Sequence, residues 1–369
     1  MAGSTPIHVC HVLLSLRPGG LENGVVNVVN GLDARRFRST VCCLQELGEF
    51  ALRIADSRVE KYAMGLRGGN DLRLPLRLAW LFRSIGVDIV HTRNAEAGFY
   101  GIAAAKIGRI GAIVHSEHGR TFPEKPHRAW LQRKLMSRID GAFAVSETLR
   151  SDLIREIGID ESRIGVIYNG VNLQSFAASH DRDGDAAREI VIGSVGRLVG
   201  VKNYSLMLRA FAALPRTLRT RLLLVGDGPM REELERLADD LAIAGRVEFA
   251  GHSEQVPLQL RKMDIFVLPS LSEGLSNTLM EAMASGVAAV ASRVGGNPEL
   301  ISSGNTGLLF ESQDQQGLTD CLAMLIGDPG RRQAMALAGA AKMRAQFSLP
   351  GMIERYENLY TKVMQGHPS

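Results

Sequence analysis

Cysteine is scarce in this chain of 369 residues, which has only four, at Cys10, Cys42, Cys43 and Cys321. They form no Cys-x-x-Cys pair and no metal-ligand spacing, so we expect no thiolate metal site. Thiols without such a pattern are typical of small buried side chains in a reducing compartment, which favours the cytoplasm.

Long uninterrupted hydrophobic segments are also missing. Residues 1–9 lack the basic start and the continuous apolar stretch of a secretory signal. The most apolar later region, 97–114, is interrupted by Lys106 and Arg109. We therefore expect no segment to span a membrane.

A large excess of one charge is absent too, because the net charge is only +4. The basic residues are nevertheless unevenly shared, since residues 1–180 contain 23 Lys and Arg against 17 Asp and Glu. A basic first half is compatible with attraction to an anionic membrane surface or a phosphate-bearing acceptor, and equally with an ordinary solvated surface. The excess is too small, and no basic and aromatic platform recurs, so the sequence does not indicate nucleic-acid recognition.

The length exceeds that of one ordinary hydrophobic core and predicts two domains. Apolar runs alternate with helical stretches, which is typical of α/β proteins with parallel sheets. Strands are expected at residues 7–14, 39–44, 88–91, 112–117, 141–145, 164–167, 190–195, 221–225, 247–250, 265–269, 288–291 and 307–310. A polar stretch, 177–186, is expected to link a first domain at 1–175 to a second at 188–348.

The most informative segment is 272–286, in which Glu273 and Glu281 stand eight residues apart. It follows an expected buried strand, so its loop lies at the strand's carboxyl end. Ser276 or Asn277 can cap the next helix and Gly286 can end it. Backbone N–H groups at the start of this helix would make a phosphate cradle, with the carboxylates accepting hydroxyl groups on either side of a diphosphate.

Two further segments carry residues suited to phosphate. Arg197 and Lys202 follow the expected strand at 190–195, where a guanidinium and an ammonium could clamp a departing diphosphate. Gly19 and Gly20 follow the first strand and would let the backbone approach a phosphate closely. His118 would lie at a strand's carboxyl end, the edge where open α/β sheets bind ligands.

Seven ordered blocks together resemble the retaining glycosyltransferases of family four, which have the GT-B fold. The blocks are Gly19-Gly20, Ser116-Glu-His-Gly119, Val145-Ser-Glu147, Val166-Ile-Tyr-Asn-Gly-Val171, Gly196-Arg197 with Lys202, Val225-Gly-Asp-Gly-Pro229 and Val294-Gly-Gly-Asn-Pro-Glu299, beside the Glu-x7-Glu pair of Glu273 and Glu281. The resemblance implies two Rossmann-like domains facing across a cleft. It also implies that the helical segment 349–369 crosses back to the first domain, although a plain terminal helix of the second domain stays an alternative.

The resemblance also assigns roles at the site. His118, Arg197, Lys202 and Glu273 would be catalytic, with His118 beside the transferred sugar. The donor would be bound by Gly19, Gly20, Arg197, Lys202, Glu273, Gly274, Leu275, Ser276, Asn277 and Glu281. No metal or other cofactor is expected, and the metal-binding motif imitated by Asp181-Arg-Asp183 is rejected because it lies in the linker.

The implied reaction moves a hexosyl unit from a nucleoside diphosphate sugar to an acceptor hydroxyl with retention of anomeric configuration. Because Glu273 and Glu281 are expected to hold hydroxyl groups, we favour a front-face route, in which the leaving phosphate helps to remove the acceptor's proton, over a covalent intermediate. Ser276 and Ala288 stand where the family often has Pro, so the sequence does not say which sugar fits.

The acceptor is less readable. Residues 11–30 are similar to exopolysaccharide sugar transferases associated with exosortase systems, which implies a glycan on a polyprenyl diphosphate. The basic, aromatic-containing stretch 120–138 fits either peripheral contact with the inner face of the cytoplasmic membrane or a surface helix with Trp130 anchored in the core. Two other functions stay open: a nucleotide-sugar epimerase of the same architecture, and a non-enzymatic nucleotide-binding protein suggested by the partial glycine fingerprint at Gly226.

Overall fold

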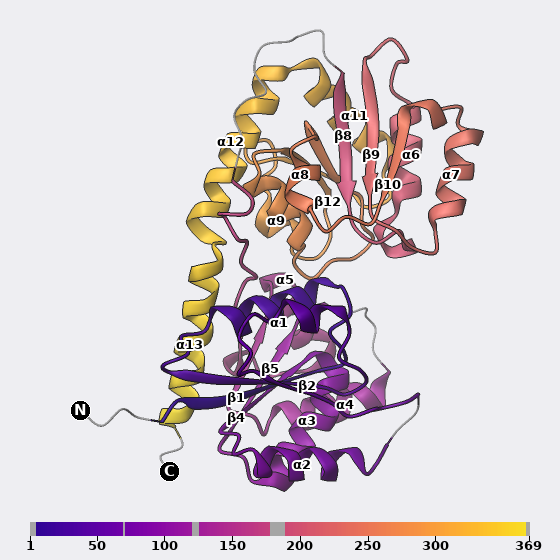
Figure 1. Ribbon diagram of the computed structural model, residues 1–369. Helices are drawn as coiled ribbons and strands as arrows, with labels where there is room; N and C mark the ends of the chain where they lie inside the picture. The colour runs from indigo at the N-terminus through magenta and orange to yellow at the C-terminus, as the bar shows by residue number, and fades with distance from the viewer. Residues whose placement is uncertain (1–4, 69–70, 120–124, 178–188, 367–369) are drawn as a thin grey trace. The chain divides into compact units, whose positions relative to one another are not determined.

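The computed structural model describes residues 5–68, 71–119, 125–177 and 189–366. The chain forms two compact units, the first made of residues 1–170 with 349–369 and the second of residues 171–348 (Figure 1). The division falls at Gly170 and Val171, five residues before the expected end of the first domain. The expected linker motif Asp181-Arg-Asp183 lies outside the described residues.

The first unit is built on a parallel sheet of seven strands in the order β3-β2-β1-β4-β5-β6-β7. The strands are β1 (Ile7–Leu13), β2 (Phe37–Cys43), β3 (Glu60–Ala63), β4 (Ile89–Arg93), β5 (Ala112–Glu117), β6 (Gly141–Ala144) and β7 (Ile164–Val166). The sequence predicted all of these except β3. That edge strand has four residues and none of them is fully buried, so it lacks the apolar run that marks the others.

Helices cover both faces of this sheet, because alternate side chains of a strand point to opposite sides. The helices are α1 (Gly20–Gly31), α2 (Leu74–Ser84), α3 (Asn94–Gly108), α4 (Pro126–Met136), α5 (Glu147–Asp152) and α13 (Leu349–Gln365). Cys10 and Val12 of β1 pack into one core with α2 and α3. Val9, on the other face, packs into a second core with α13.

The terminal helix α13 is part of the first unit. Its buried residues Met352, Ile353, Tyr356, Tyr360 and Val363 join Val9, Phe37 and Ile89 in one core. Gly31 of α1 permits this approach, since a Cβ at that position would lie 2.8 Å from the side chain of Ile353. The apolar residues that recur at helical spacing therefore form the face that α13 buries against the first unit.

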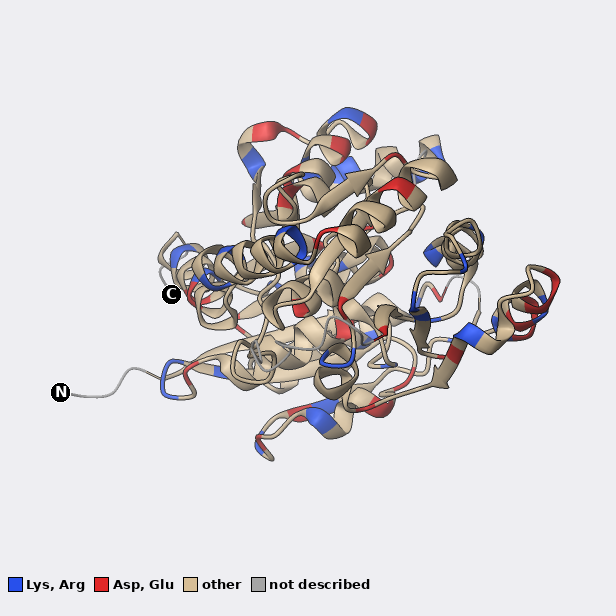
Figure 2. Cartoon of the chain, turned by 90° about the horizontal axis from the view of Figure 1, so that it is seen from above, with Lys and Arg blue, Asp and Glu red and all other residues tan. Residues whose placement is uncertain are grey.

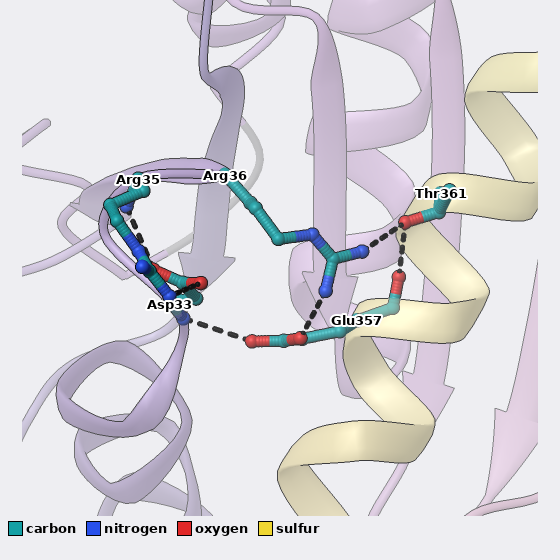
Figure 3. Close-up of polar contacts among 5 residues, drawn as sticks. All are labelled: Asp33, Arg35, Arg36, Glu357 and Thr361. Carbon is teal, nitrogen blue, oxygen red and sulfur yellow. Dashed lines mark hydrogen bonds and ion pairs between the residues drawn. The ribbon is translucent and has the colours of Figure 1, made fainter.

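A polar network fixes α13 to the loop after α1 (Figure 3). Glu357 accepts from the backbone N–H of Asp33 at 2.9 Å and from Arg36 Nη1 at 2.6 Å. Arg36 Nη2 also donates to Thr361 Oγ1 at 3.1 Å, one helical turn further on. The Glu357 side chain is only 14% exposed, so its carboxylate needs these partners.

The second unit has a parallel sheet of six strands in the order β10-β9-β8-β11-β12-β13. The strands are β8 (Ile190–Val195), β9 (Thr220–Val225), β10 (Val247–Gly251), β11 (Ile265–Leu268), β12 (Ala288–Ser292) and β13 (Leu308–Phe310). Its helices are α6 (Tyr204–Ala212), α7 (Arg231–Asp240), α8 (Val256–Leu260), α9 (Asn277–Ala284), α10 (Asn297–Leu300), α11 (Gln315–Gly327) and α12 (Pro329–Gln346). Both units therefore have the parallel, helix-covered architecture that the sequence predicted.

Candidate active site

The strand order of the second unit reverses between β8 and β11, which are neighbours although two strands separate them in the chain. Open α/β sheets bind ligands at such a point, outside the carboxyl ends of the strands. Lys202 follows β8 and Glu273 follows β11. The topology thus brings together two segments that the sequence singled out separately.

Glu273 is held by two side chains at this edge. Its Oε1 accepts from Lys202 Nζ at 2.6 Å and from Ser270 Oγ at 2.7 Å. The side chains of Lys202 and Glu273 are only 22% and 11% exposed, so the pair is shielded from much of the solvent. Ser270 was missed in the sequence, although its place at the end of an apolar strand run could have indicated it.

The loop that carries Glu273 leads directly into α9. Ser276 is the residue that caps this helix, because its Oγ accepts from the backbone N–H of Leu279 at 3.3 Å. Gly286 follows the helix with φ +71°, the left-handed conformation expected at its end. The start of α9 therefore lies in the same loop as Glu273, three residues away, whereas Glu281 lies within the helix and is partly exposed.

A glycine pair after β12 supports this loop. Gly296 donates its backbone N–H to the carbonyl of Gly274 at 2.9 Å. Gly295 has φ +49°, and a Cβ there would overlap the carbonyl oxygen of Glu273. The block 294–299 thus serves the site by allowing the backbone beside Glu273 to approach closely.

Arg197 lies beside a second glycine-rich loop. It is exposed in the turn after β8, where its neighbour Leu198 donates a backbone N–H to the carbonyl of Asp227 at 3.0 Å. Gly226 and Gly228 have φ of +140° and +158°, and each faces backbone of residues 196–198. These glycines are explained by close backbone packing, without a dinucleotide in the loop.

The first unit has its own strand-order reversal, between β1 and β4. Gly19 follows β1 as the residue before α1, and its carbonyl accepts from the backbone N–H of Asn23 at 3.0 Å. Gly20 begins the helix and is exposed. His118 follows β5, the strand next to β4, so these residues lie at the ligand-binding edge of the sheet.

His118 is positioned by both its backbone and its ring. Its N–H donates to Asn94 Oδ1 at 2.8 Å, and Asn94 has the uncommon φ of +61° for a residue other than glycine. Its Nε2 lies 2.9 Å from Ser116 Oγ and 3.4 Å from Arg93 Nη1. Since a guanidinium only donates, Nε2 is an acceptor and Nδ1 carries the proton.

Arg93 is the main functional candidate that the sequence analysis missed. It ends β4, is only 1% exposed, and donates to His11 Nδ1 at 3.2 Å and to Tyr356 OH at 3.2 Å as well as facing His118. Its charge also lies 5.5 Å from the ring centre of Tyr356. The sequence did offer one signal for it, because Arg93 is a basic residue at the end of an apolar strand, within His91-Thr-Arg-Asn94.

This buried cation keeps the surrounding histidines neutral. Burial, and next the charge of Arg93, hold the pKa of His11, His91 and His118 well below the usual 6.5. His91 in turn contacts Ser116 Oγ at 3.0 Å and Tyr360 OH at 2.7 Å. His118 therefore presents a neutral imidazole, held through Arg93 and Tyr356 by the terminal helix α13.

Among the described residues, no group of three or more His, Cys, Asp or Glu side chains could hold a metal ion. The same residues contain no helix with the length and hydrophobicity that a membrane span requires. Trp130 of α4 is 53% exposed, so it is not anchored in the core.

Comparison with known families and proteins agrees with this geometry. Residues 18–175 match the family described as Glycosyltransferase Family 4, and residues 176–342 match Glycosyl transferases group 1. A GDP-mannose-dependent alpha-(1-6)-phosphatidylinositol monomannoside mannosyltransferase of Mycolicibacterium smegmatis is 31% identical over 68% of this chain and 72% of its own. A UDP-Gal:alpha-D-GlcNAc-diphosphoundecaprenol alpha-1,3-galactosyltransferase of Escherichia coli is 27% identical over 70% of this chain and 71% of its own.

Solved structures show the same fold. HepE of Anabaena, crystallised with UDP, superimposes with a TM-score of 0.85 over 96% of this chain and 100% of its own, at 20% identity. WaaG, a glycosyltransferase involved in lipopolysaccharide biosynthesis, gives a TM-score of 0.72 over 93% of this chain and 97% of its own, at 18% identity. The chain belongs to the family 4 glycosyltransferases, enzymes of the GT-B fold that use nucleotide-sugar donors.

Proposed function

We propose that this glycosyltransferase transfers a hexosyl unit from a nucleoside diphosphate sugar to an acceptor hydroxyl with retention of anomeric configuration and without a metal. The observation that carries the proposal is the ion pair between Lys202 and Glu273 beside the start of α9. It places a cation, a carboxylate and the positive end of a helix at one sheet edge. A diphosphate that bears a sugar is the ligand these groups fit best.

Each group then has a chemical role in the second unit. Lys202 and the start of α9 stabilise the charge that develops on the leaving diphosphate, with Arg197 as a further cation from the turn after β8. Glu273 uses Oε1 for Lys202 and Ser270. Its Oε2 accepts a hydroxyl group of the transferred sugar, and Glu281 accepts one of the ribose.

This use of Glu273 favours a front-face mechanism. The ammonium and the hydroxyl bound at Oε1 withdraw charge from the carboxylate, and Oε2 is assigned to a sugar hydroxyl, so Glu273 is a poor nucleophile. The leaving phosphate is the better-placed base for the acceptor's proton. A covalent adduct on Glu273, trapped with a slow donor and found by mass spectrometry, would contradict this mechanism.

The first unit serves the transferred sugar and the acceptor. Neutral His118, with its proton on Nδ1, is suited to donate a hydrogen bond to a sugar hydroxyl rather than to carry charge. The E. coli relative is named as acting on a diphosphoundecaprenol-linked sugar. We propose by analogy a glycan on a polyprenyl diphosphate, built for an exopolysaccharide or another cell-surface polymer at the inner face of the cytoplasmic membrane.

Thermal-shift measurements with UDP, GDP, ADP and their sugars identify the donor, because a ligand that binds the folded state raises the melting temperature with the logarithm of its concentration relative to its Kd. Donor turnover is then measured with and without a lipid-linked acceptor and with EDTA. We expect turnover to require the acceptor, to survive EDTA, and to give a product with the donor's anomeric configuration by NMR. Acceptor-independent release of an altered sugar would favour the epimerase instead.

A matched pair of variants links the activity to the site. Lys202→Met removes the cation and should reduce turnover at least about a hundredfold. Lys262→Met removes an exposed lysine of the same unit and should leave turnover unchanged. Equal activity of the two variants would show that the diphosphate binds elsewhere.

A further inference from the structure

Helix α2 of the first unit is apolar on two faces, of which the structure covers only one. Leu74, Leu78 and Phe82 are buried in the core beneath the helix. On the outer side of the helix, Leu76 and Trp80 are 59% and 73% exposed, and Leu72, four residues before Leu76 in the turn that precedes the helix, is 87% exposed. Residues spaced in this way line up along one face of a helix.

The exposed apolar side chains continue onto the neighbouring helix α3. Ile107, near its end, is 49% exposed. Together with Leu76, Ala79, Trp80, Arg83 and Ser84 it lines a hollow of about 420 Å³. A contiguous apolar surface with a central tryptophan marks an interaction site more often than scattered exposed residues do.

The surrounding charge has a single sign. Residues 72–86 and 101–111 contain no Asp or Glu, and their five basic residues are Arg73, Arg77, Arg83, Lys106 and Arg109. All five are exposed, and Arg77 is 3.7 Å from Asp71 just outside these segments. Helices α7 and α13 carry both signs (Figure 2), whereas α4 and α12 are also purely basic.

We propose that this α2 surface, made of Leu72, Leu76, Trp80 and Ile107 with the five basic residues, docks the enzyme on a bilayer that contains anionic lipid. Apolar side chains and a Trp suit the boundary between headgroups and acyl chains, and the flanking cations suit the anionic headgroups. The inference deepens the membrane contact of the proposed function by naming the surface. It rests on the proposed function only for the biological reason to bind a membrane, which is that a lipid-linked acceptor lies in the bilayer.

Other surfaces and occupants fit less well. A second copy of the chain would place five cations against five, which disfavours a symmetric dimer through this surface. Helix α4, within the stretch that the sequence favoured for membrane contact, also exposes Trp130, but Lys134 stacks on that ring at 5.0 Å and Arg128 pairs with Glu96 at 3.6 Å. The α2 surface combines more exposed apolar side chains with charge of one sign.

The two tryptophans of the chain allow a direct test, since one lies on each surface. Trp130→Phe leaves Trp80 as the only indole, and Trp80→Phe leaves Trp130. With vesicles of phosphatidylcholine and phosphatidylglycerol at low salt, we expect a blue shift and quenching by brominated lipid only when Trp80 is present. A response confined to Trp130 would overturn the proposal in favour of α4.

Flotation measures the strength of binding. Leu76→Ser with Trp80→Ser should reduce vesicle binding at least tenfold, and Arg83→Ser about fivefold, because each cation near an anionic surface contributes about that factor. The control is Leu52→Ser, an equally exposed leucine (91%) in the segment Glu49–Arg53, which packs on the opposite face of the same sheet.

The proposal would be overturned if the enzyme did not bind anionic vesicles at low salt, or if it bound neutral vesicles equally well. It would also be overturned if Leu52→Ser lost as much vesicle binding as the α2 variants. A concentration-dependent dimer that replaces vesicle binding and is abolished by Trp80→Ser would assign the surface to a second copy of the chain instead. Folding of each variant is checked by circular dichroism, and turnover of the nucleotide-sugar donor on a water-soluble acceptor should be unchanged. Because vesicle binding needs neither donor nor acceptor, its failure would leave the proposed reaction untouched.

Discussion

Gly295 is the backbone position where a single methyl group should separate activity from stability. Its φ of +49° lies in the left-handed region, so any other residue there is strained by about 1–2 kcal/mol. In Gly295→Ala the new Cβ would also overlap the carbonyl oxygen of Glu273 and lie 2.7 Å from its carbonyl carbon, against 3.4 Å for an ordinary contact. The Glu273 backbone would therefore have to retreat by at least about 0.7 Å, and further to clear the oxygen.

A shift of that size acts on the carboxylate that pairs with Lys202. Misplacement of a catalytic group by about 1 Å costs on the order of a hundredfold in rate. We expect Gly295→Ala to reduce kcat/KM by about tenfold to a hundredfold and to weaken the stabilisation that the nucleoside diphosphate gives in thermal shift. The free energy of unfolding should fall by about 2–3 kcal/mol, the larger part of it from the left-handed strain.

Gly304 provides the matched control in the same unit. Its φ is +86°, and a Cβ there would meet nothing within 4 Å. Gly304→Ala should therefore show the strain of about 1–2 kcal/mol in urea unfolding while its turnover stays normal. Equal turnover of the two variants, or equal losses in both, would refute the conclusion that Gly295 supports the Glu273 loop.

Three further perturbations test the polar contacts. Lys202→Met should lower the free energy of unfolding, measured in urea, by about 1–2 kcal/mol, because it leaves the charge of Glu273 uncompensated. Adding Glu273→Gln removes that charge and should recover part of the loss. If the double variant recovered nothing, the ion pair would be contradicted. The free energy of unfolding should fall as the pH drops from 7.5 to 5, because the pKa of His11, His91 and His118 is lowered in the folded chain and the unfolded chain binds protons that the folded chain does not. Each of the three contributes up to about 1.4 kcal/mol per pH unit. His91→Asn should flatten this slope, and an unchanged slope would contradict the lowered pKa of His91. Glu357→Gln should lower the free energy of unfolding by about 0.5–1.5 kcal/mol, whereas Glu354→Gln, at an exposed position of the same helix, should leave it almost unchanged. Equal changes in the two variants would contradict a stabilising role for the polar network on α13.

The sequence predicted the strands of both sheets except β3, mostly because strands that are buried on both faces appear as apolar runs. Strand β10, which has no fully buried residue, was predicted as well. It also predicted the loop from Glu273 to Ser276, since a strand end, a helix cap and a terminating glycine are all local features. The edge strand β3 escaped because a half-exposed strand of four residues carries little hydrophobic pattern. Local patterns thus determined most of the fold.

Pairings between distant segments could not be predicted from local pattern. The bond from Lys202 to Glu273 joins residues 71 apart, and the bond from Arg93 to Tyr356 joins residues 263 apart. Neither follows from spacing, because the first depends on which strands become neighbours and the second on which sheet α13 packs against. Arg93 was missed for the same reason, since an arginine becomes noteworthy only when its surroundings turn out to be buried.

The membership of α13 in the first unit has a consequence for biosynthesis. Residues 171–348 form a continuous stretch with its own core, so this unit can complete its fold as soon as it has left the ribosome. The first unit cannot, because Tyr356 and Tyr360 are translated after the whole second unit and until then Arg93 and His91 lack their hydroxyl partners. The sheet edge around His118 should consequently mature only after α13 has been translated, so we expect a product that stops before α13 to be inactive even when most of its structure has formed.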